Sequence, residues 1–106
     1  MKHVTMAEKS LLVGTEVADL LTQYAALLAQ LRGGDAVTLR AYGIDGEEVE
    51  ATFVLNSGVV LMAESTRSPL PEPDNSAAVA YLRERLDSFG PASGIPEGSG
   101  AAQGLG

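Results

Sequence analysis

Apolar residues recur at helical spacing in the stretch that begins at Thr15. Steps of four and three residues separate Val17, Leu21, Tyr24, Leu28 and Leu31. This spacing places their side chains on one face of an amphipathic helix. Leu20 and Leu27 widen the apolar face, which favours contact with both a sheet and a second helix. Thr15 is the predicted N-cap, and Gly33-Gly34 is predicted to end the helix.

Three segments farther along the chain alternate apolar and polar residues with a period of two. They comprise residues 37–42, 48–55 and 59–64. Such alternation is typical of strands that bury one face. Turn-forming residues at 44–46 and 56–58 separate the segments. The pattern therefore predicts a three-stranded antiparallel meander with the middle segment as its central strand.

The length of each turn predicts the register of the strands. A three-residue loop at residues 44–46, with Gly46 in the left-handed conformation, brings the apolar residues of both strands to one face. A two-residue turn would send one apolar set to the opposite face, so we reject it. The predicted pairs are Ala41 with Val49, Leu39 with Ala51 and Val37 with Phe53. The same reasoning at residues 56–58 predicts Leu55 with Val59, Phe53 with Leu61 and Ala51 with Ala63.

A proline-rich connector and a second helix follow the strands. Alternate positions from Pro69 to Pro73 are proline, and they predict that residues 65–74 form a stiff, extended spacer. The second helix is predicted to begin with Asn75 or Ser76 as its cap. Helical spacing predicts one buried face, made of Val79, Leu82, Leu86 and Phe89.

The predicted fold class is α+β, a two-layer sandwich with the element order α-β-β-β-α and both helices on one face of the meander. Residues 15–89 are predicted to form this single domain, and a chain of 106 residues has room for one. Residues 1–14 are predicted as an N-terminal arm, in which residues 10–13 form either a short strand or a segment packed on the body. Residues 90–106 are rich in Gly, Ala and Ser, which predicts a disordered tail.

Charge and composition narrow the classes of partner. Fourteen Asp and Glu residues oppose seven Lys and Arg residues, and the formal net charge is −7 at pH 7. This sign repels phosphate backbones and anionic lipid surfaces and favours basic proteins. We therefore expect no nucleic-acid partner and no membrane partner. The absence of cysteine and of a secretory signal predicts a cytoplasmic location in a cell of bacterial type.

The sequence carries no motif for catalysis, metal binding or phosphate binding. His3 is the single histidine, and it lies in the predicted arm with no identifiable nucleophile to activate. The acidic run of Asp45, Glu47, Glu48 and Glu50 lacks the spacing of a calcium-binding loop. We therefore predict no catalytic residue, no cofactor and no metal ligand, and we expect the protein not to be an enzyme. A small enzyme that uses carboxylates is an alternative function, ranked below the two functions considered next.

The order α-β-β-β-α resembles that of double-stranded-RNA-binding domains and of small dimeric nucleoid proteins. The RNA-binding domains with this order place lysines at the start of the last helix, where this chain has Glu72, Asp74 and Asn75. That difference reverses the charge that RNA binding requires. A nucleic-acid-associated dimer is therefore the disfavoured alternative, because a shared fold does not carry function.

A surface for protein–protein contacts is predicted on the sheet face away from the helices. The register brings together the candidate interaction residues Val54, Val60, Met62, Thr52, Tyr42, Arg40 and Glu50. Residues 59–63 contain neither charge nor proline, which usually protect an edge strand. This predicts a homodimer through that edge, unless residues 11–13 cover it. The leading functional hypothesis is a small acidic interaction module, acting as an adaptor or as an antagonist of a basic protein.

Overall fold

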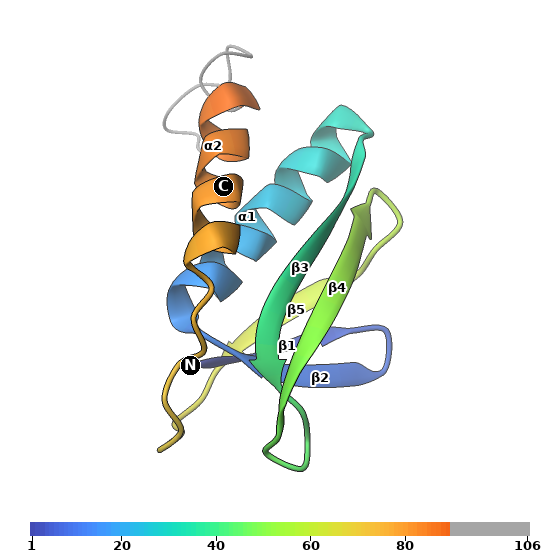
Figure 1. The fold of residues 1–106 in the computed structure, drawn as a ribbon. Helices are drawn as coiled ribbons and strands as arrows, with labels where there is room; N and C mark the ends of the chain where they lie inside the picture. The colour runs from blue at the N-terminus through green and yellow to red at the C-terminus, as the bar shows by residue number, and fades with distance from the viewer. Residues whose placement is uncertain (90–106) are drawn as a thin grey trace.

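The structure, a computed structural model, describes residues 1–89, and the tail predicted for residues 90–106 lies outside them. Five strands and two helices follow one another in the order β-β-α-β-β-β-α (Figure 1). The strands are β1 (Lys2–Met6), β2 (Lys9–Val13), β3 (Gly34–Tyr42), β4 (Glu48–Asn56) and β5 (Leu61–Ser65), and the helices are α1 (Thr15–Leu31) and α2 (Ser76–Phe89). The α+β class is confirmed, whereas the predicted order α-β-β-β-α lacked the first two strands.

All strand pairs are antiparallel, and the sheet has the order β4-β3-β2-β1-β5. The β3–β4 hairpin has the predicted register, which pairs Ala41 with Val49 and Val37 with Phe53. Gly46 adopts the predicted left-handed conformation, with φ at 82°. The predicted meander is wrong beyond this hairpin, because β4 is an edge strand and β5 pairs with β1 instead of β4.

The residues predicted as an arm form β1 and β2, a hairpin with Ala7 and Glu8 at its turn. Val4 of β1 is fully buried and lies opposite both Leu11 of β2 and Ala63 of β5. Alternation fixes which face of a strand is buried, but it does not name the neighbouring strand. For this reason, the apolar face of β5 suits β1 as well as it suits β4.

Helix α1 packs against the sheet, and α2 packs on α1 and along β3 (Figure 1). The broad apolar face of α1 therefore contacts both the sheet and the second helix, as its width predicted. Tyr24, Leu21, Leu39, Leu55 and Leu82 are fully buried at the centre of this core.

Both ends of α1 differ from the predicted caps. The N-cap is Gly14, which has no side chain to accept a hydrogen bond, and the carboxylate of Glu72 accepts one from the Thr15 N–H at 3.4 Å instead. At the other end Arg32 adopts the left-handed conformation, with φ at 55°. Gly34 already belongs to β3, so the helix ends earlier than the glycine pair suggested.

Candidate functional site

Strands β2 and β3 are joined at one position only, where Leu12 pairs with Tyr42. Beyond that pair the β1–β2 and β3–β4 hairpins point in different directions (Figure 1). The space between them is an open groove with a volume of about 1080 Å³. Residues of all five strands, the turns after β1 and β3, and Leu70 line this groove. The groove exists because two hairpins that share a sheet diverge after a single contact.

The edge of β2 presents main-chain groups to the groove. The Asn75 side chain hydrogen-bonds to the N–H and C=O of Arg40, so these main-chain groups of β3 point away from β4. Main-chain groups along a strand point to alternate sides, so the N–H and C=O of Tyr42, two residues later, also point away from β4. Leu12 lies opposite Tyr42, and its main-chain groups therefore face β3. Alternation directs the N–H and C=O of Ser10 to the same side, where no β3 residue pairs with it.

The side chains that line the groove combine apolar contact with negative charge. Ile44 is fully exposed at the turn after β3, and Leu70 is partly exposed between β5 and α2. Among the described residues, one lysine, Lys9, lines the groove. Four carboxylates line it as well, those of Glu8, Asp45, Glu50 and Glu64. Within residues 1–89 none of these carboxylates forms an ion pair. The groove therefore offers unpaired negative charge beside exposed apolar surface.

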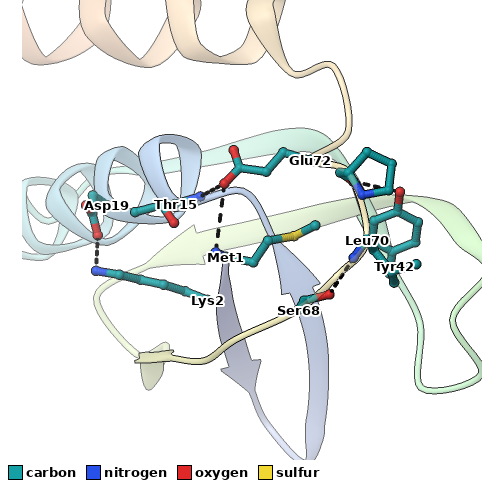
Figure 2. Close-up of polar contacts among 9 residues, drawn as sticks. Met1, Lys2, Thr15, Asp19, Tyr42, Ser68, Leu70 and Glu72 are labelled. Atoms are coloured by element: carbon teal, nitrogen blue, oxygen red, sulfur yellow. Dashed lines mark hydrogen bonds and ion pairs between the residues drawn. The ribbon is translucent and has the colours of Figure 1, made fainter.

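The polypeptide between β5 and α2, residues 66–75, is called the strap here because it is tied to the body at several points (Figure 2). The Tyr42 hydroxyl donates to the Pro71 carbonyl at 2.8 Å. The Glu72 carboxylate lies 3.8 Å from the Met1 amino group, in addition to its contact with Thr15. The alternate prolines predicted a spacer, and these contacts make it a fixed side of the groove that carries Leu70.

Asn75 ties the end of the strap to the open edge of β3. Its amide donates to the Arg40 C=O and accepts from the Arg40 N–H, both at 2.8 Å, so it replaces a neighbouring strand at that position. Its carbonyl accepts from the Val79 N–H at 2.8 Å, which makes it the first residue to join the hydrogen bonds of α2. Because the side chain of Asn75 bonds to β3, Asp74 caps the helix by accepting from the Ser76 N–H at 3.0 Å.

A second polar cluster joins α1, β3 and α2 away from the groove. The Asp35 carboxylate accepts hydrogen bonds from the hydroxyl of Tyr24, at 2.6 Å, and from that of Tyr81. Arg85 donates to the Tyr24 hydroxyl at 3.2 Å. Burial acts to raise the pKa of Asp35, but the two tyrosine hydrogen bonds, helped by the Ala36 N–H and by Arg85, outweigh it and lower that pKa.

The two tyrosines shift in the opposite direction. The hydrogen bond to Asp35, with burial adding to it, raises the pKa of Tyr81 to about 12. Burial, followed by the same carboxylate, raises the pKa of Tyr24. All three groups are stabilised in the forms that hydrogen-bond to one another, a carboxylate and two neutral phenols. The cluster satisfies its own members, and we interpret it as a fastening of α2 to the body.

The structure does not bring all the predicted interaction residues together. Thr52 and Val54 lie on β4. Met62 lies on β5, at the opposite edge of the sheet, and Val60 lies just before that strand. The Thr38 and Thr52 hydroxyls share a hydrogen bond of 2.8 Å, as neighbours in the predicted register. The predicted rows that joined β4 to β5 are wrong, because β5 pairs with β1 and not with β4.

The remaining predicted residues lie at or beside the groove. Tyr42 and Glu50 line it, and Tyr42 is buried under the strap. Arg40 is on β3 next to them and forms an ion pair with Glu48. The hydrogen bond to Glu48 is the main cause that raises the pKa of Arg40, and the charge of Glu50 adds to it. Part of the predicted surface thus belongs to one wall of the groove.

Sequence reasoning missed His3, which lies in β1 opposite Glu64 and lines the groove. Polar and apolar residues alternate over only four positions of β1, from His3 to Met6, too short a signal to separate a strand from an arm. Within residues 1–89 no hydrogen bond joins His3 to Glu64 or to Ser10, whose hydroxyl bonds to that of Thr5. The described part of the chain also has no group of three residues that could hold a metal ion.

Comparison with protein-family models, with curated proteins and with solved structures finds no match to this chain. No helix between residues 1 and 89 is both long and apolar enough to cross a bilayer. The groove and the edges of the sheet are therefore the candidate functional surfaces.

Proposed function

We propose that this protein is an interaction module that binds an extended, basic segment of a partner protein in the groove. The observation that carries the proposal is the single pair between β2 and β3, which leaves the Ser10 main chain facing an acidic groove. An extended segment can add to such an edge as a strand, because the free N–H and C=O groups supply its hydrogen bonds. Main-chain pairing would give affinity, and the side chains of the groove would give specificity.

Charge supports a basic ligand over an acidic or a neutral one. Glu50 and Glu64 line the groove from β4 and β5, and Glu8 and Asp45 lie at the turns of the two hairpins. Lysine or arginine side chains of the ligand would meet carboxylates that form no ion pair within the described chain. Between the charges, Ile44 and Leu70 would contact the apolar side chains of the same segment.

The test uses a fluorescent peptide of alternating lysine and valine, with a peptide of alternating glutamate and valine as the comparison. We expect the basic peptide to bind with an affinity that falls as salt increases, since screening weakens exposed charge pairs. Glu64→Lys should weaken binding by about tenfold or more. Glu84→Lys makes the same charge change on α2 and should leave the affinity within about twofold, as expected for a charge outside the interface.

A separate variant tests the strand edge. Ser10→Pro removes the N–H that faces the groove and should abolish binding of the basic peptide, with circular dichroism confirming that the fold is kept. Ser10→Ala keeps the main chain and should bind like the parent. Equal affinity for both peptides, or equal weakening by Glu64→Lys and Glu84→Lys, would show that the groove is not the binding site.

A further inference from the structure

Within residues 1–89, strand β5 leaves one side unpaired at the edge of the sheet opposite β4. The main-chain groups of Leu12 face β3, so those of His3, its partner in β1, face β5. His3 lies opposite Glu64, and the main-chain groups of Glu64 therefore point toward β1. Alternation turns the N–H and C=O groups of Leu61 and Ala63 to the free side, where they can pair with another strand.

The free side of β5 has only one of the features that usually prevent strand pairing, the charged Glu64 near the end of the strand. Residues 59–63 contain no charge and no proline. Val60 is 84% exposed and Met62 is 53% exposed, and both are large apolar side chains. The other edge strand is protected, because β4 carries Glu48 and Glu50. The two edges of one sheet therefore differ in how well they reject a neighbouring strand.

We propose that β5 pairs with β5 of a second copy of this chain, in antiparallel orientation around a two-fold axis at Leu61. This register places Val60 of each copy opposite Met62 of the other, so that the exposed apolar side chains cover one another. Each Glu64 then lies opposite Gly58 of the other copy, and no two carboxylates meet. A register centred on Ala63 would instead place Met62 opposite Glu64.

A second copy fits this edge better than a basic partner does. The five residues from 59 to 63 have no charge to attract a cation, whereas their apolar pattern complements itself under two-fold symmetry. Pairing would join two five-stranded sheets into one. The inference requires no ligand in the groove, and Glu64 is the residue that the groove and the paired strand share.

Sedimentation equilibrium at tens of micromolar tests the oligomeric state. We expect the parent to have twice the mass of one chain, and Val60→Lys and Met62→Lys each to reduce it to a single chain with an unchanged circular dichroism spectrum. Val54→Lys is the matched control, because Val54 is 55% exposed on β4 and should leave the mass doubled. A parent with the mass of one chain, or dissociation by Val54→Lys alone, would overturn the proposal.

Cysteine cross-linking tests the register, and the chain has no cysteine of its own. Val60→Cys and Met62→Cys variants mixed under mild oxidation should form a disulfide-linked pair, because the register places the two positions opposite one another without main-chain hydrogen bonds between them. Either variant alone should give much less linked product. Equal linking by each variant alone would overturn the two-fold axis at Leu61.

Discussion

At the junction of α1, β3 and α2, the Asp35 carboxylate accepts hydrogen bonds from Tyr24, at 2.6 Å, and from Tyr81. In the groove, Glu8 and Glu64 form no ion pair with any residue from 1 to 89. The two regions contain the same kind of side chain and use it differently. One region pairs its charge internally, and the other presents it to solvent.

This difference separates the parts of the molecule that hold the fold from the part that is available to a ligand. Removal of the half-buried Asp35 carboxylate would leave its two tyrosine hydroxyls without this acceptor, which is costly for the hydroxyl of the buried Tyr24. An exposed carboxylate is hydrated in the free protein, so its removal has little effect on the free energy of unfolding. We therefore expect variants in the two regions to change different properties.

The largest expected loss of stability comes from Asp35→Ala. It leaves the Tyr24 hydroxyl without an acceptor, and Tyr24 is 0% exposed. The free energy of unfolding should fall by about 2 kcal/mol, measured by urea denaturation. The groove counterpart, Glu64→Ala, should change it by less than about 0.5 kcal/mol. Equal losses for the two variants would remove the distinction between the regions.

A smaller loss is expected when the strap is released. Asn75→Ala removes both hydrogen bonds to the main chain of Arg40 and should lower the free energy of unfolding by about 1–2 kcal/mol. Asn56→Ala is the matched control, because its side chain accepts one local hydrogen bond from the Gly58 N–H. The control should cost about half as much. If Asn75→Ala has no effect in urea denaturation, the strap is not held at this position.

The parts of the fold that could be predicted from the sequence are those that depend on residues close together in the chain. The β3–β4 hairpin was predicted with its register because Gly46 and the alternation on both sides are local in the chain. The pairing of β5 with β1 joins residues about sixty positions apart, such as Val4 and Ala63, and no local pattern encodes it. The five residues of β1, three of them polar, gave too little periodicity to recognise, whereas a short strand was one of the two alternatives predicted for residues 10–13, where β2 lies.

The candidate site was predictable only in fragments. The acidic turn at Asp45 and the wall residues Tyr42 and Glu50 were visible in the sequence. The groove itself results from the angle between two hairpins, and neither hairpin determines that angle alone. His3 and Glu64 became neighbours only through the pairing of β1 with β5. Sites that depend on strand order in this way cannot be located before the order is known.

A modest gain of stability is expected in the hairpin that borders the groove. Ala7 has φ at 58°, a conformation that costs an L-residue about 1 kcal/mol and costs glycine almost nothing. Ala7→Gly should therefore raise the melting temperature slightly, partly offset by the greater freedom of glycine in the unfolded chain. Glu8→Gly changes the neighbouring turn position, where φ is not positive, and should lower it. A higher melting temperature for Glu8→Gly than for Ala7→Gly would mean that the backbone strain lies elsewhere in the turn.

The smallest effects are those of pH, and they concern only the internally paired region. Because hydrogen bonds lower the pKa of Asp35, its contribution to stability is present above the ordinary value of 3.8 and is lost as pH falls through the lower folded value. Because Tyr81 has its pKa raised from 10.0 to about 12, its contribution is present below pH 10 and is lost as pH rises toward 12.

Titration of tyrosinate absorbance, compared between the parent and Tyr81→Phe, isolates the ionisation of Tyr81. In Asp35→Asn, which removes the charge but keeps an acceptor, Tyr81 should ionise nearer its ordinary value. An unchanged titration would mean that Asp35 does not hold Tyr81, and the fastening of α2 would then depend on the burial of Leu82 and on the contacts of Arg83 and Arg85.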